Sequence, residues 1–69
     1  MNIELFIVAT EWKNGTPPTV SCFSDYESAK TVLDVVPMAS RVTIHQRKNY
    51  VTEMVLLQEN GIIKEWPLR

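Results

Sequence analysis

Enzymatic chemistry in this chain would have to start from its single histidine and single cysteine, His45 and Cys22. In the strand pairing that we favour below, His45 faces Glu53, which is the arrangement of a general base and the carboxylate that orients it. Such cross-strand pairs are most often solvated contacts worth about 0.2–1 kcal/mol. Cys22 falls in a different predicted strand, with no third group and no oxyanion donor beside it. We therefore predict that the protein is not an enzyme and has no catalytic residue.

Metal and cofactor sites have little material in this sequence. One cysteine and one histidine cannot build a structural zinc site. Both glycines, Gly15 and Gly61, fall in predicted turns and leave none for a phosphate-binding loop. Cys22 lies in an apolar strand pattern, so we expect a buried thiol rather than a reactive one. We expect no metal and no cofactor.

The densest basic cluster lies between residues 41 and 50. Its members are Arg41, His45, Arg47 and Lys48, with Tyr50 beside them. A sheet that carries cations and an aromatic ring can bind a single-stranded nucleic acid through phosphate contacts and base stacking. It can also bind an acidic protein surface, and charge on a strand also protects a sheet edge against aggregation. Nucleic-acid binding is the alternative function that the sequence supports.

Composition sets the broad class of the protein. The 69 residues are enough for one core, so we expect residues 1–69 to form a single domain. Seven Lys and Arg against eight Asp and Glu give a net charge of −1, unlike a general nucleic-acid binder. The apolar run Leu5–Ala9 is too short for a signal peptide or a membrane span. A lone cysteine also excludes the internal disulfide that small secreted domains usually carry, so we expect a cytoplasmic protein without membrane contact.

Apolar periodicity predicts the element order β-β-α-β-β-β. The predicted strands are 2–12, 19–23, 41–47, 51–59 and 62–66, and Asn14–Gly15 and Asn60–Gly61 are clear turn signals. A helix is predicted from about Asp25 to Val35, with Ser24 as its N-cap, Glu27 closing a capping box and Pro37 ending it. The fold class is α+β: one helix packed on one face of a mostly antiparallel four- or five-stranded sheet. Residues 38–58 hold few helix breakers, so a partly helical segment there is the alternative.

The register of the third and fourth strands decides which side chains share a face. A two-residue turn at Lys48–Asn49 sets Ile44 opposite Glu53. A three-residue turn at Lys48–Tyr50 keeps apolar residues together, with Ile44 opposite Met54, Val42 opposite Leu56 and His45 opposite Glu53. We favour the second register.

One helix covers one face of such a sheet, which leaves apolar residues on the other. The covered face takes Val42, Ile44, Met54 and Leu56. A second apolar face above a few hundred Å² usually marks an interface, and Trp12 and Trp66, at strand ends, are either lids of the core or interface anchors. The expected protein interface is Val51, Val55, Leu57, Ile63, Trp66 and Trp12. In the rival arrangement the first strand or Pro67–Arg69 folds over this face.

These patterns favour a small protein-binding module that acts by self-association, as a homodimer, or by docking on a partner protein. The stretch Cys22–Leu33, a strand end followed by a capped amphipathic helix, resembles many small phage and mobile-element proteins. The resemblance implies an accessory protein that binds a host component, and an inhibitor that blocks a host complex would act in this way.

Overall fold

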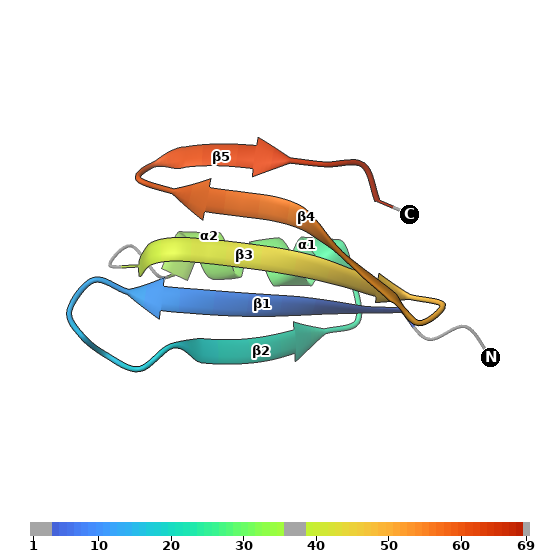
Figure 1. Cartoon of the computed structure of the whole chain (residues 1–69), viewed down its shortest axis with the longest axis horizontal. Helices are drawn as coiled ribbons and strands as arrows, with labels where there is room; N and C mark the ends of the chain where they lie inside the picture. The colour runs from blue at the N-terminus through green and yellow to red at the C-terminus, as the bar shows by residue number, and fades with distance from the viewer. Residues whose placement is uncertain (1–3, 36–38, 69) are drawn as a thin grey trace.

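The computed structural model describes residues 4–35 and 39–68, which form an α+β fold (Figure 1). The elements are β1 (Glu4–Trp12), β2 (Thr19–Phe23), α1 (Tyr26–Lys30), α2 (Val32–Val35), β3 (Ala39–Lys48), β4 (Val51–Glu59) and β5 (Ile62–Glu65). The strands make one sheet in the order β2-β1-β3-β4-β5, and every neighbouring pair is antiparallel. The predicted fold class and element order are confirmed.

Most strand boundaries match the prediction. β2 and β4 cover the predicted residues, β3 extends beyond 41–47 at both ends, and β5 stops one residue early. Residues 39–59 form a β-hairpin, so the helical alternative for this segment is wrong. Residues 2 and 3 of the first predicted strand, Val36 and the predicted helix stop Pro37 lie outside the described residues.

The helical segment begins one residue later than predicted and is split in two. Asp25, not Ser24, is the N-cap: its carboxylate accepts hydrogen bonds from the Ser28 amide and hydroxyl, both at 2.9 Å. Thr31 separates α1 from α2, since its hydroxyl donates to the Ser28 carbonyl at 2.6 Å. A hydroxyl that bonds back to the preceding turn competes with regular helix hydrogen bonding. The two short helices therefore form one layer with a break at Thr31.

The core lies between this helical layer and the sheet. Its buried apolar residues are Phe6, Val8, Ala29, Val42, Ile44, Val55 and Leu56, each no more than 2% exposed. Tyr26, Val32 and Leu33 pack against them from the helices, with the Phe6 and Tyr26 ring centroids 5.6 Å apart. Alternate residues of β1 and β3 thus face the helices, as period-2 patterning requires.

The β3–β4 hairpin differs from both predicted registers. Its turn is Asn49–Tyr50, with positive φ at both residues (52° and 66°), so Lys48 pairs with Val51. His45 pairs with Met54 and Ile44 with Leu56, which leaves Val55 as an extra residue in a β-bulge. A uniform register cannot accommodate this insertion, and the predicted opposition of His45 and Glu53 is wrong.

The bulge changes which side chains of β4 face the core. Val55 and Leu56 are adjacent in sequence, yet both are buried, at 2% and 0% exposure. Before the bulge the even-numbered residues of β4 share a face with the odd-numbered residues of β3, and after it the odd-numbered residues of β4 do. Met54, opposite His45, and Leu57, opposite Thr43, therefore lie on the same face. Met54, predicted for the covered face, therefore lies on the opposite one.

Candidate protein interface

One face of the sheet has no element packed on it among the described residues. Figure 1 shows α1 and α2 behind the sheet, and the strands facing the viewer carry no further layer. We call this surface the open face. The strand registers place these apolar residues on it: Leu5, Ile7, Ala9, Val20, Cys22, Met54, Leu57 and Ile62. They come from β1, β2, β4 and β5, so apolar side chains extend to both sides of β3.

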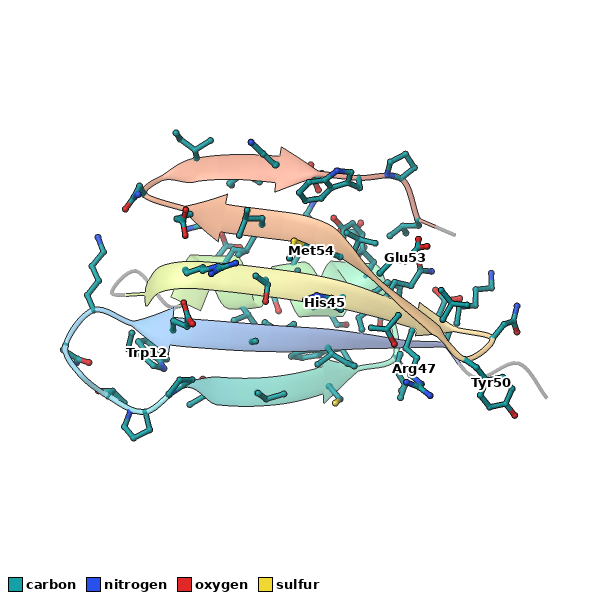
Figure 2. The ribbon with its side chains drawn as sticks, viewed as in Figure 1. Trp12, His45, Arg47, Tyr50, Glu53 and Met54 are labelled. Carbon is teal, nitrogen blue, oxygen red and sulfur yellow. The ribbon has the colours of Figure 1, made fainter. Side chains whose placement is uncertain are left out.

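β3 contributes the polar side chains of the open face. Thr43 is 9% exposed and His45 is half-buried at its centre, next to Ile7 on β1 and Met54 on β4. Figure 2 shows His45 on the middle strand, with Met54 beside it. Arg47 lies towards the β3–β4 turn, where its Nη1 donates to the Thr52 hydroxyl at 3.3 Å. The apolar residues of the open face therefore lie on the strands on either side of β3, and the central strand itself is polar.

The end of the open face furthest from the β3–β4 turn carries charges of both signs. Arg41 Nε lies 3.7 Å from Glu59 Oε2, Glu11 pairs with Arg41 from β1, and Lys64 pairs with Leu57 from β5. A shallow hollow of about 180 Å³ lies at this end, between Leu57 and Ile62. Two cations and two anions bordering an apolar surface resemble the polar rim of a protein interface.

The four strand residues predicted for the interface do not share one face. Leu57 lies on the open face, opposite Thr43. Val55 is part of the core, because the bulge turns it towards the helices. Ile63 pairs with Gln58 and lines a hollow beside α1 and α2, and Val51 pairs with Lys48 on the same helix-facing side. The predicted grouping of these residues is wrong for Val51, Val55 and Ile63.

The two tryptophans lie at opposite ends of the sheet. β1 and β5 are separated by three antiparallel steps, so their C-terminal ends, which carry Trp12 and Trp66, point in opposite directions. Trp12 is half-buried, and its buried indole N–H has no hydrogen-bond partner among the described residues. Trp66 is 43% exposed, and its amide donates to the Val55 carbonyl at 3.0 Å. They cannot anchor a single small contact together.

The candidate acid–base pair is separated by the sheet itself. His45 points to the open face, whereas Glu53 pairs with Gln46 on the helix-facing side. Cys22 is exposed on the edge strand β2, which overturns the expectation of a buried thiol. Among the described residues no three His, Cys, Asp or Glu side chains lie close enough to hold a metal ion.

The basic cluster is also dispersed. Arg41 and Arg47 are six residues apart on one extended strand, about 20 Å. Lys48 faces the helix side, where its Nζ lies 3.9 Å from Glu4 Oε2. Tyr50 is 91% exposed at the tip of the β3–β4 hairpin (Figure 2), whereas Arg41 lies near the other end of β3. Arg41, His45 and Arg47 do share the open face, but Lys48 does not.

A polar contact holds β5 to the helical layer. The Tyr26 hydroxyl donates to Glu65 Oε1 at 2.8 Å, and Lys30 Nζ lies 3.2 Å from the same oxygen. Burial, and then the Glu65 carboxylate, raises the pKa of Tyr26 to about 12. The hydrogen bond from Tyr26 and the nearby Lys30 lower the pKa of Glu65. With Glu65 fixed on the helix side, alternation places Lys64 and Ile62 on the open face.

Sequence reasoning missed Met54 and Ile62 as members of the open face. Met54 belongs to the unbroken apolar run Met54–Leu57, in which polarity does not distinguish the residues of one face from those of the other. A bulge within such a run shifts the alternation without leaving a sign in the sequence pattern. Ile62 was missed because the face on which it lies depends both on the turn at Asn60–Gly61 and on the bulge.

Comparison with known protein families, with curated proteins and with solved structures finds no match to this chain. In the described part of the chain, no helix is long and apolar enough to cross a membrane.

Proposed function

We propose that this protein is a non-enzymatic protein-binding module that associates with a second copy of itself through the open face. The observation that carries the proposal is the one-sided packing of the sheet: α1 and α2 cover one face, and the other exposes apolar residues from four of its five strands. Ile62 and Val20, near its two lateral edges, are 65% and 66% exposed. Covering such a surface removes apolar area from water at about 25 cal/mol per Å².

The charges at the polar end of the face suit a symmetric contact. A two-fold axis places each surface against itself, so a rim of one sign would repel its own copy. This end carries Arg41 and Lys64 together with Glu11 and Glu59, so opposite charges are available on both copies. The face thus avoids the main electrostatic penalty of self-association.

The area of the face argues for a weak contact. The strands lie about 4.8 Å apart, and β1, β3 and β4 place four residues each on the face while β2 and β5 place two each, which makes roughly 500 Å² per copy. A standard interface buries about 800 Å² per partner, and smaller ones are typically transient. We therefore expect reversible association at micromolar or higher concentrations.

A partner protein is the alternative occupant of the same face. The resemblance of Cys22–Leu33 to small phage and mobile-element proteins makes a host complex one such partner, blocked when this domain covers its surface. Nucleic-acid binding is less well supported, because Arg41 lies beside Glu59 and is about 20 Å from Arg47. A single-stranded nucleic acid would need several coordinated phosphate contacts, and its binding would weaken steeply with salt.

β5 provides a matched pair of variants for the test. Ile62 and Ile63 are consecutive and comparably exposed (65% and 52%), but Ile62 lies on the open face and Ile63 on the helix side. We expect Ile62→Glu and Leu57→Glu to lower the average molar mass measured by light scattering, and Ile63→Glu to leave it unchanged. Circular dichroism checks that each variant is folded. A wild-type protein that stays monomeric up to millimolar concentration would overturn self-association through this face.

A further inference from the structure

The two edges of the sheet differ in how they are protected. The outer strand β5 carries Lys64 and Glu65, and Glu65 is fixed to the helices through Tyr26 and Lys30. The outer strand β2, Thr-Val-Ser-Cys-Phe, carries no charge and no proline, and its first four residues are exposed. Proteins normally guard edge strands with charge, proline or a covering element. By this criterion β2 is an unguarded edge.

Nothing in the described chain covers the outer side of β2. It lies at the end of the strand order, next to β1 alone, and Figure 1 shows no segment beyond it. Alternate residues of β2 therefore present unpaired backbone N–H and C=O groups, which can pair with another strand.

Backbone geometry restricts how β2 can pair with its own copy. In an antiparallel pair, opposite residues must both direct their hydrogen-bonding groups to the partner or both away from it. Consecutive residues direct their hydrogen-bonding groups to opposite sides of the strand, so paired residues must be an even number of positions apart in the sequence. In a pair related by a two-fold axis normal to the sheet, one residue must therefore lie opposite the same residue of the second copy. Of the five positions in β2, Ser21 is the central one, and a pair centred there uses the whole strand.

We propose that β2 pairs with β2 of a second copy about Ser21, joining two five-stranded sheets edge to edge. In this register Val20 lies opposite Cys22 of the second copy on the open face. Thr19 lies opposite Phe23 on the other face, where Phe23 packs against the core. Small apolar residues meet each other, and a β-branched residue meets an aromatic one, as cross-strand pairing favours. The second copy fits this edge because no like charges oppose each other.

Edge pairing bears directly on the open face. A two-fold axis normal to the sheet keeps the open faces of both copies on the same side, so they form one continuous surface of roughly 1,000 Å². That area exceeds the roughly 800 Å² per partner of a standard interface, which one open face alone does not reach. This consequence rests on the proposed function, whereas the edge pairing itself does not.

Cysteine crosslinking tests the register. Ser21→Cys with Cys22→Ser places one thiol per chain at the symmetric position, where opposite Cα atoms lie within the range a disulfide spans. The matched control is Thr19→Cys with Cys22→Ser, since Thr19 is also exposed on the same side of β2 but is offset from its own copy by about 13 Å. Both double variants are made in the Leu57→Glu background, which removes association through the open face.

We expect the Ser21→Cys variant to form a covalent dimer at least about tenfold faster than the Thr19→Cys variant under mild oxidation, because the two thiols of the control lie outside disulfide range. Equal rates would indicate random collision, and faster crosslinking of the Thr19→Cys variant would indicate another register; either result overturns the proposal. Because the open face is already blocked, this outcome is independent of the outcome for Ile62→Glu.

Charge substitution provides a second readout. Ser21→Lys places two like charges opposite each other, as does Ser21→Glu, so each variant alone should lose edge pairing. A mixture of the two, again with Leu57→Glu, should regain a dimer by light scattering, since Lys then faces Glu. Thr31→Lys, at the exposed break between α1 and α2, is the control that should retain edge pairing. A mixture that stays monomeric would overturn the proposal, provided that circular dichroism shows folded chains.

Discussion

The two faces of this sheet are built from the same strands but have different environments. On the covered face, Phe6, Ile44 and Leu56 are no more than 1% exposed beneath the helices. On the open face, Ile7 and Leu57 are only half-buried, by their neighbours within the sheet. Leu56 and Leu57 are adjacent and chemically identical, and the bulge at Val55 fixes which of them enters the core. A one-residue insertion in β4 therefore determines the composition of both faces.

Truncation of these two leucines tests the comparison of the two faces, and it should give the largest of the predicted effects. Leu56→Ala removes a fully buried side chain and should lower the free energy of unfolding by about 2–5 kcal/mol. Leu57→Ala removes a half-buried one, and under dilute, monomeric conditions we expect a loss below about 1 kcal/mol. Urea denaturation of both variants measures the difference. Equal losses would mean that Leu57 is also a core residue and that the faces are wrongly assigned.

The β3–β4 turn sets the register of β3 and β4 up to the bulge, and it offers a smaller test. Asn49–Tyr50 and Asn60–Gly61 have similar φ angles, 52° and 66° in the first turn and 52° and 79° in the second. Glycine adopts this left-handed conformation freely, whereas a bulky residue does so at a cost of about 1–2 kcal/mol.

Tyr50→Gly should therefore raise the free energy of unfolding by up to about 1 kcal/mol, part of the gain being lost to the greater freedom of glycine in the unfolded chain. Because Tyr50 is 91% exposed, its removal should leave the register and the association unchanged. Thermal unfolding measures the change in stability, and light scattering measures the association. A variant that is less stable would show that the Tyr50 side chain makes a stabilising contact.

The contact that holds β5 to the covered side should give the smallest effect. The pKa of Tyr26 is raised to about 12, so its contribution to stability is complete below the ordinary value of 10 and is lost as the pH rises towards 12. The pKa of Glu65 is lowered, so its contribution is present above 4.5 and is lost as the pH falls through its lower, folded value.

Ultraviolet titration should show one tyrosine ionising near pH 12, and Tyr26→Phe should remove that step. Loss of this exposed hydrogen bond should cost at most about 1 kcal/mol at neutral pH. If the high-pH step persists in Tyr26→Phe, it belongs to another group, and the proposed role of the Tyr26–Glu65 contact in holding β5 would be contradicted.

Local signals predicted the elements, but not the pairing between them. Alternation located β2 and β4, and turn residues located the hairpins, because these features depend on neighbours in sequence. Ser24 and Asp25 are both good N-caps, and propensity alone does not distinguish them. The Asn49–Tyr50 turn gave no signal, since a tyrosine rarely occupies a position that requires positive φ.

The composition of the candidate interface was predicted less well than the fold. That one face would remain uncovered followed from counting one helical layer, and Leu57 was correctly placed on that face. Val51, Val55 and Ile63 were misplaced because each depends on the turn or on the bulge, and both arise from packing across strands. Interface membership itself stays a prediction for every one of these residues.

Isoleucine methyl NMR over a dilution series tests the central claim most directly, since the described isoleucines are divided between the faces. Ile7 and Ile62 lie on the open face, Ile44 is in the core, and Ile63 is on the helix side. If two copies associate through the open face, the Ile7 and Ile62 methyl signals should shift together with rising concentration, while those of Ile44 and Ile63 stay in place. Signals of Ile7 and Ile62 that remain constant up to millimolar concentration, or a shift of Ile63 alone, would contradict the account.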